Sequence, residues 1–366
     1  MSAENAEPPE YYYIIDLLRV AAALVILVVH YHNLFFIGTK IMPAFNVLSQ
    51  PFYGPLSIFY NYGFMAVQLF WIISGFVFAA VYLKKKAVTG KEFFINRFAR
   101  LYPLALLTLI VVAVLQIISM LTTNHFQLPV IYDAYHFVLN LGFVSAWGFE
   151  HGYSFNSPIW SVSIEIFIYT LFFFTIPYIV KHGAKVTILI LAALSTLILF
   201  ELSTPFWLCG VYFFIGCLLF QFTRRFSYYK IHQLLFGVGG ILLSCALVLF
   251  IPNLFSQQIP QFLFEVILFC SIIMCAGAVD LMYHKRIGPR FKMFGNLSYG
   301  IYLWHIPIQI VLLLIFEYFA LDKNIVYSEW FFVFFIVIVI ITAYISYKYF
   351  ENPIRKRIRK YADTKV

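Results

Sequence analysis

Long apolar runs alternate with short polar connections along most of this chain. A helix needs about 20 apolar residues to cross the hydrocarbon core of a membrane, and ten runs come close to that length or reach it. The predicted spans are 14–37, 60–83, 102–122, 158–180, 184–201, 207–222, 232–251, 261–283, 293–318 and 329–350. The pattern predicts an all-α, polytopic integral membrane bundle of about ten transmembrane helices, with residues 1–366 forming a single transmembrane domain.

A further apolar stretch, 131–148, is predicted to re-enter the membrane or lie at its external surface. It contains Asp133 and His136, which are costly inside hydrocarbon. If it crossed, every later connection would change sides and the charge pattern of the connections would be lost. The connection 123–157 around it is long and aromatic, and loops of such length are commonly functional.

Composition and charge agree with a membrane protein and orient it. The chain is 63% hydrophobic and only 11% charged, whereas soluble domains carry about 25% charged residues. Of the 25 Lys and Arg residues, 21 fall in one alternate set of connections, and Lys40 and Lys323 are the two in the other set. This bias predicts that both termini are cytoplasmic. It also explains the net charge of +9 without a nucleic-acid partner.

Two further features restrict the class of protein. The first thirteen residues lack a positively charged n-region, so they are predicted to be a short acidic tail and not a signal peptide. All five cysteines lie inside apolar runs without metal-ligand spacing, which predicts packing residues and no metal site.

The first predicted span carries two ionisable residues that share a face. Arg19 and His30 are eleven residues apart, about three helical turns and ~16 Å along the axis. Ionisable groups inside a membrane are functional candidates. The alternative is an arginine that extends to the interface and a histidine that packs through hydrogen bonds.

The fourth predicted span opens with a polar cluster. Ser161 and Glu165 share a face at i, i+4, and Trp160 precedes them. Glu165 is expected at the same depth as His30, which would pair a carboxylate with an imidazole. The alternative is a structural Glu165 bonded to backbone or to a tyrosine. The ninth span adds Tyr302 and His305, where His305 is a second catalytic or a structural candidate.

Residues 91–101 are predicted to form a short amphipathic helix that ends before Pro103. Arg97 and Arg100 lie on one face, and Lys84–Lys86 are close in sequence. Such a cluster suits phosphate groups, because arginine binds them through two hydrogen bonds. The alternative is that these charges bind anionic membrane lipids.

In this order, the motifs resemble the acyltransferase-3 family. They are Arg19 and His30 with ten residues between them, Ser74-Gly75-Phe76, Arg97 with Arg100, Trp160-Ser161 with Glu165, LSYGIYLWHIP at 297–307, and Glu351 with Pro353. The resemblance implies a membrane-bound O-acetyltransferase of the bacterial cytoplasmic (inner) membrane. Because the chain ends at Val366, it resembles the stand-alone members, which modify surface polysaccharides such as lipopolysaccharide.

The resemblance also implies a donor, an acceptor and roles for the candidates. Acyl-CoA, most often acetyl-CoA, would bind through Arg19, Arg97 and Arg100. His30 would be the general base on a hydroxyl of a surface or lipid-linked glycan, and Glu165 would orient its ring. Trp160, Ser161, Tyr302 and His305 would bind substrate.

Three alternatives stay open at this point. An acyl-enzyme on serine or on His30 could replace direct transfer. Intramembrane Arg, His and Glu side chains also form proton relays, so a secondary transporter is a rival function. A third possibility is a membrane acyl carrier that hands its acyl group to another enzyme. Sequence does not distinguish the acceptor sugar, its hydroxyl, the acyl group or the oligomeric state.

Overall fold

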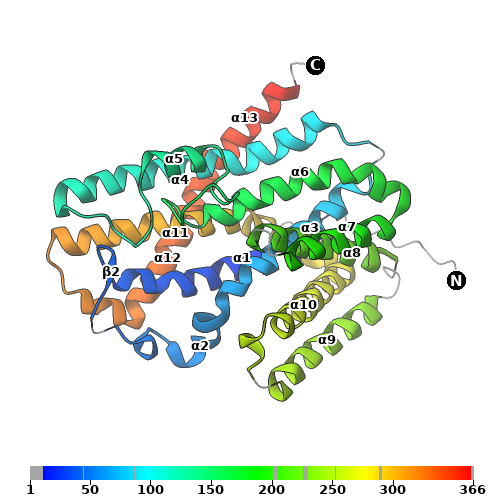
Figure 1. The fold of residues 1–366 in the computed structure, drawn as a ribbon, viewed down its shortest axis with the longest axis horizontal. Helices are drawn as coiled ribbons and strands as arrows, with labels where there is room; N and C mark the ends of the chain where they lie inside the picture. Colours follow the sequence, from blue (N-terminus) through cyan, green and yellow to red (C-terminus); the bar gives the residue numbers. More distant parts are fainter. Residues whose placement is uncertain are drawn as a thin grey trace. The chain divides into compact units, whose positions relative to one another are not determined.

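The structure, a computed structural model, describes residues 11–43, 45–85, 87–200, 204–225, 230–251, 253–287 and 291–363. Most of these residues are helical (Figure 1). Lys86 of the predicted basic cluster lies outside the described residues. The α-helices are α1 (Tyr13–His30), α2 (Tyr53–Tyr62), α3 (Ala66–Tyr82), α4 (Gly90–Thr123), α5 (Ala134–Leu141), α6 (Ile159–His182), α7 (Ala184–Leu199), α8 (Thr204–Arg225), α9 (Lys230–Phe250), α10 (Gln258–Ile287), α11 (Lys292–Tyr318), α12 (Glu329–Ser346) and α13 (Asn352–Asp363).

The predicted all-α membrane bundle is confirmed. Within the described residues, nine helical segments are long and apolar enough to cross a membrane, and they coincide with nine of the ten predicted spans. The remaining predicted span, 184–201, corresponds to α7, an apolar helix of 16 residues. The stretch 131–148 contains only the eight-residue helix α5, so it does not form a helix of spanning length.

One predicted helix boundary is wrong, and one helix continues beyond the end of its predicted span. No separate helix ends before Pro103, because α4 continues through that proline from Gly90 to Thr123. Proline removes one backbone donor but does not stop a helix that neighbouring elements hold in place. The helix of the last predicted span, 329–350, also continues past residue 350. It passes through a π-helical turn, η7 (Tyr347–Glu351), into the basic helix α13.

The described residues group into two compact units, each assembled from separate stretches of chain. Unit 1 comprises residues 1–22, 67–87 and 168–295, and unit 2 comprises 23–66, 88–167 and 296–366. The single-domain organisation stays a prediction.

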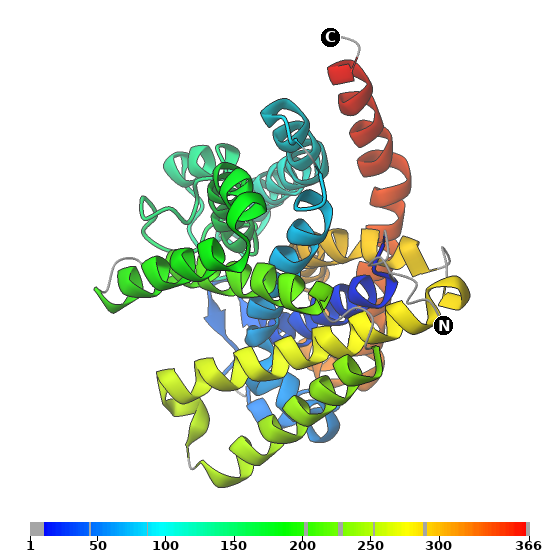
Figure 2. The same ribbon diagram turned by 90° about the vertical axis from the view of Figure 1, so that its right-hand side faces the viewer.

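In unit 1, α7 packs against α8, and α9 runs beside α10 (Figure 2). Helices α3 and α8 approach closely through two glycines. A Cβ at Gly75 would lie 1.8 Å from the Phe213 carbonyl oxygen, and one at Gly216 would lie 2.0 Å from that of Ile72. The glycine of the Ser74-Gly75-Phe76 motif therefore has a packing role, because only glycine permits this helix contact.

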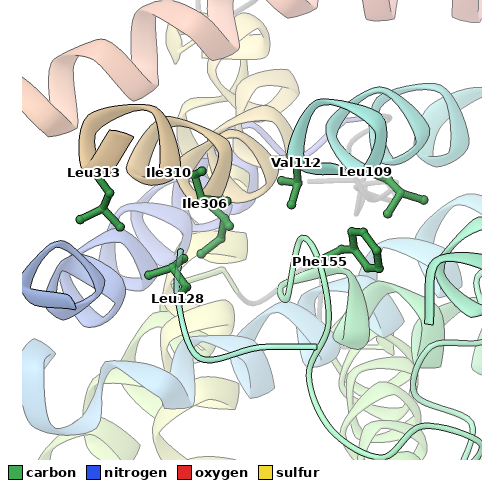
Figure 3. Close-up of a cluster of buried hydrophobic side chains, with 7 residues drawn as sticks. All are labelled: Leu109, Val112, Leu128, Phe155, Ile306, Ile310 and Leu313. Atoms are coloured by element: carbon green, nitrogen blue, oxygen red, sulfur yellow. The ribbon is translucent and has the colours of Figure 1, made fainter. Parts of the chain in front are cut away.

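In unit 2, an apolar cluster joins α11 to α4 and to the long connection 124–158. It consists of Leu109, Val112, Leu128, Phe155, Ile306, Ile310 and Leu313 (Figure 3). In the figure, the isoleucines of α11 lie opposite the α4 side chains, and Leu128 and Phe155 extend from the connection. This cluster fixes α11 next to the connection, and α11 carries Tyr302 and His305.

The connection between α1 and α2 begins with a short hairpin in unit 2. A 3₁₀ turn, η1 (Tyr31–Phe35), follows α1 directly and leads into β1 (Phe36–Ile37). β1 pairs antiparallel with β2 (Lys40–Ile41), with Phe36 opposite Ile41. Gly38 in the turn has a φ of +57°, a conformation that glycine adopts without strain.

Candidate active site

Two histidines from distant parts of the chain form a hydrogen-bonded pair in unit 2. Nδ1 of His30, the last residue of α1, lies 2.7 Å from Nε2 of His305 on α11. The rings are stacked, with centroids 4.9 Å apart. His305 is fully buried, whereas His30 is half-buried. His30 is therefore the less buried member of the pair.

The surroundings of His305 indicate where the shared proton lies. Its Nδ1 is buried and has no hydrogen-bond partner among the described residues, and the backbone carbonyls one turn earlier on α11, at Ile301 and Tyr302, are the acceptors beside the ring. Carbonyl oxygens only accept hydrogen bonds, so they favour a proton on Nδ1 of His305. Nε2 of His305 then accepts from Nδ1–H of His30. In this assignment Nε2 of His30 has a lone pair.

A second contact from α11 holds the backbone of His30. Gln309 is fully buried, and its Nε2 donates to the carbonyl oxygen of His30 at 2.7 Å. Its Oε1 accepts from Nδ2 of Asn33 at 3.0 Å. Carbonyls in the last turn of an α-helix lack partners within the helix, and Gln309 supplies one where α1 changes to η1. Residues 305 and 309 are one turn apart on α11, so one face holds both the ring and the backbone of His30.

A proline in α11 explains the contact with Asn156. Pro307 has no N–H, so the carbonyl oxygen of Leu303, four residues earlier, loses its usual helical donor. Nδ2 of the fully buried Asn156 donates to this oxygen at 3.0 Å. The connection before α6 is thereby attached to α11 two residues from His305.

Ser161 and Tyr302 form a second polar group. Their hydroxyls lie 2.9 Å apart, and both lie close to the carbonyl oxygen of Pro158, at 3.2 Å for Ser161 and 3.1 Å for Tyr302. The Tyr302 ring is 6.2 Å from the His305 ring between centroids. Glu165 and Tyr153 both interact electrostatically with Tyr302. The structure therefore joins Ser161 to Tyr302, and it gives His305 as the ring partner of His30.

Trp160 lies at the start of α6 beside an exposed tyrosine. Its ring centroid is 6.0 Å from that of Tyr153, with the planes tilted by 55°. Trp160 is half-buried, and Tyr153 is 59% exposed.

The predicted phosphate-binding arginines lie near the start of α4. Arg100 lines a small pocket with Arg355 and Asn352 of α13, and Glu351 is also at the wall. Arg97 is one turn earlier on the same helix, in the described part of unit 2. Arg19 belongs to unit 1, where its Nη1 lies 3.5 Å from Oδ1 of Asp16.

Two charged groups in connections have shifted pKa values. The backbone N–H and the imidazole of His136 donate to Asp133, and they hold the pKa of that carboxyl below its usual value. Burial lowers the pKa of Lys323 to about 8, although Glu317 opposes the shift. The Lys323 ammonium donates to the carbonyl oxygen of Phe36 in the hairpin. Both contacts fix connections of unit 2.

The prediction of no metal site is not contradicted. Over the described ranges, no three or more His, Cys, Asp or Glu side chains gather in an arrangement that could hold a metal ion. Sequence reasoning missed Gln309 and Asn156 entirely. A glutamine one turn from His305 inside an apolar run was the available signal for Gln309, whereas the pairing of Asn156 with Leu303 depends on the fold.

A family model described as an acyltransferase domain matches residues 12–347. Among curated proteins, the chain is 27% identical to "Putative peptidoglycan O-acetyltransferase YrhL" of Bacillus subtilis (strain 168), over 88% of this chain and 55% of that protein. It is 25% identical to O-acetyltransferase OatA of Staphylococcus aureus (strain NCTC 8325 / PS 47), over 87% of this chain and 57% of that protein. The chain thus spans about half the length of the curated relatives it matches. No solved structure matches it.

Proposed function

Since the chain belongs to the acyltransferase-3 family, a family of membrane acyltransferases with relatives named as O-acetyltransferases, we propose that it transfers an acyl group from acyl-CoA to a glycan hydroxyl. Acetyl is the proposed acyl group, because both relatives are named as O-acetyltransferases. The observation that carries this proposal is the His30–His305 hydrogen bond of 2.7 Å. This hydrogen bond fixes the orientation of the half-buried His30 imidazole.

His30 acts as the general base. Its Nε2 takes the proton of the glycan hydroxyl while the hydroxyl oxygen attacks the thioester carbonyl carbon. A C–O bond forms, the C–S bond breaks, and the proton passes from His30 to the departing CoA thiolate. The products are the acyl ester and free CoA, so the step balances without another reactant. A positioned base of this kind contributes about 10²- to 10⁴-fold to the rate.

His305 takes the role that the sequence assigned to Glu165. By accepting from Nδ1–H of His30, it selects the ring tautomer whose Nε2 is free, and it delocalises charge when His30 is protonated. Glu165 acts on the other polar group instead, through its interaction with Tyr302.

Ser161 and Tyr302 stabilise the developing oxyanion or hold the acceptor. Each hydroxyl has one proton, which the Pro158 carbonyl or the other hydroxyl accepts in the structure, so either hydroxyl stabilises an oxyanion by turning its O–H from that partner toward the charge. The partners of the Ser161 hydroxyl in the structure are Tyr302 and Pro158, neither of which is a strong base. This arrangement favours direct transfer over an acyl-serine intermediate at Ser161.

The arginines near the start of α4 suit the donor. Acyl-CoA carries phosphate groups, and Arg97 and Arg100 provide planar donors that bind phosphates through two hydrogen bonds. The pocket at Arg100 also contains Arg355, which raises its positive charge, while Glu351 opposes it. Arg19 of unit 1 is proposed as a further donor-binding residue on the basis of the family motif.

The acceptor is proposed to be a bacterial surface or lipid-linked glycan. The relative YrhL is named for peptidoglycan, and lipopolysaccharide stays a second proposed acceptor. The protein would lie in the cytoplasmic membrane with both termini inside, as the excess of Lys and Arg in alternate connections predicts. Acyl-CoA would then arrive from the cytoplasm, among the membrane lipids that surround the protein.

One experiment separates this proposal from a transporter and an acyl carrier. Purified protein in liposomes is incubated with radiolabelled acetyl-CoA and solubilised peptidoglycan strands or lipopolysaccharide. The proposal predicts base-labile acetate on one of these glycans together with release of CoA. Label that stays on the protein would support the carrier, and an absence of any covalent change would support the transporter.

A further inference from the structure

The connection before α6 holds an exposed aromatic side chain in a rigid setting. The N–H of Ile131 donates to the Tyr153 carbonyl oxygen at 2.9 Å, and the N–H of Phe155 donates to the Ile131 carbonyl oxygen at 3.2 Å. Ser154, between them, accepts from Nδ2 of the buried Asn140 at 2.8 Å. These bonds fix the backbone on both sides of Tyr153.

A further contact holds the same connection at His151. The N–H of His151 donates to Nε2 of His136 at 3.2 Å, and Nδ1 of that imidazole lies 2.8 Å from Asp133. His136 is buried, and both of its ring nitrogens have partners. It therefore serves as a support, and the segment 151–155 is held in place before any ligand binds.

Tyr153 lies between the solvent-exposed surface and the candidate active site. Tyr153 is 59% exposed, and its ring centroid is 6.0 Å from that of Trp160. Trp160 directly precedes Ser161, whose hydroxyl is 2.9 Å from that of Tyr302, and the Tyr302 ring is 6.2 Å from that of His305. Tyr153 and Trp160 thus lie at the outer end of a series of neighbouring side chains that continues through Tyr302 and His305 to His30.

We propose that Tyr153 and Trp160 form the acceptor subsite, which binds a pyranose ring of the glycan beside Tyr302. This inference rests on the proposed function. The C–H faces of a sugar ring pack on aromatic rings, and a tyrosine offers apolar area together with a polar hydroxyl at little cost in entropy. A rigid backbone lowers the ordering cost of binding further. Tyr153 is thus a specificity residue and does not take part in proton transfer.

The test compares Tyr153→Ala with a matched variant, Phe149→Ala. Phe149 lies on the same connection and is 56% exposed, and the carbonyl that accepts from the Tyr135 hydroxyl remains after this substitution. Rates are measured with acetyl-CoA and solubilised peptidoglycan strands or purified lipopolysaccharide. Hydrolysis of acetyl-CoA without glycan is measured in parallel. The amount of inserted protein is compared for each variant, and Tyr153→Phe retains the ring.

The subsite predicts that Tyr153→Ala raises KM for the glycan about 2- to 12-fold, the value of one aromatic contact. The kcat, KM for acetyl-CoA and hydrolysis without glycan stay at wild-type values. Phe149→Ala behaves as wild type, and Tyr153→Phe, which keeps the ring but loses the hydroxyl, raises the glycan KM less than Tyr153→Ala does. An unchanged glycan KM in Tyr153→Ala, or an equal rise in Phe149→Ala, would overturn the subsite alone. A wild-type protein that acetylates neither glycan would overturn the proposed function and the subsite together.

Discussion

Replacement of Asn156 by alanine tests how α11 is held beside the connection before α6. The substitution removes the 3.0 Å hydrogen bond to the Leu303 carbonyl oxygen. Because Pro307 lacks an N–H, no helical donor replaces Asn156. A buried acceptor without a partner costs about 1–3 kcal/mol. For a chain of this size, that cost corresponds to a decrease of about 1–4 °C in the midpoint of thermal unfolding.

The same oxygen allows a rescue experiment. Pro307→Ala restores a backbone N–H four residues after Leu303, so it should return most of the lost stability in the Asn156→Ala background. The two substitutions should therefore be strongly non-additive. In contrast, Asn61→Ala removes a solvent-exposed hydrogen bond to the Tyr53 hydroxyl. This substitution should change the free energy of unfolding by less than about 0.5 kcal/mol.

The assay is the fraction of protein that keeps its native size-exclusion peak after heating in detergent, with acetyl transfer measured at a permissive temperature. Transfer should also decrease in Asn156→Ala, because Leu303 is two residues from His305. If Asn156→Ala/Pro307→Ala is no more stable than Asn156→Ala, the hydrogen bond to Leu303 does not explain the role of Asn156.

Three further predictions concern packing, the donor and pH. Gly75→Ala should abolish the folded protein, because its Cβ would meet the Phe213 carbonyl oxygen at 1.8 Å, whereas Gly54→Ala meets nothing within 4 Å and should leave the membrane level unchanged. Arg100→Gln should raise KM for acetyl-CoA about 10-fold without changing KM for the glycan, and an unchanged acetyl-CoA KM would exclude a phosphate contact. Lys323 has a pKa of about 8 in the fold and about 10.4 when unfolded, so the unfolded chain binds more protons between these values. Thermal stability should therefore rise with pH through this window in wild type, and the rise should be smaller in Lys323→Met.

The membrane spans could be predicted from sequence because hydrocarbon restricts the possible structures so strongly. A span must satisfy its own backbone hydrogen bonds, so a long apolar run has few options other than a helix. The boundary before Pro103 was predicted wrongly for a related reason. Proline disfavours a helix locally, but the contacts of α4 with α13 and α11 hold the helix through it. Tertiary contacts of this kind are not visible in a local pattern.

The candidate site was predicted in part. His30 is a candidate because an ionisable side chain inside a membrane costs free energy and is therefore commonly functional. This argument does not require its partner to be known. The choice of Glu165 as its orienting residue rested on equal depth, which leaves the rotation of each helix undetermined. The structure instead pairs His30 with His305. The sequence does not indicate Gln309, because a neutral side chain in an apolar run is not marked out by charge. In the structure its Nε2 donates to the His30 carbonyl oxygen.

The most direct test of the account is acetyl transfer by His30→Ala, measured as base-labile acetate on the glycan at equal levels of membrane-inserted protein. His32→Ala is the matched control, because this half-buried imidazole is two residues away and contacts the Val29 carbonyl oxygen at 2.7 Å. The account predicts a loss of about 10²- to 10⁴-fold in His30→Ala and nearly unchanged transfer in His32→Ala. Wild-type transfer by an inserted His30→Ala protein would contradict the proposal that His30 is the base.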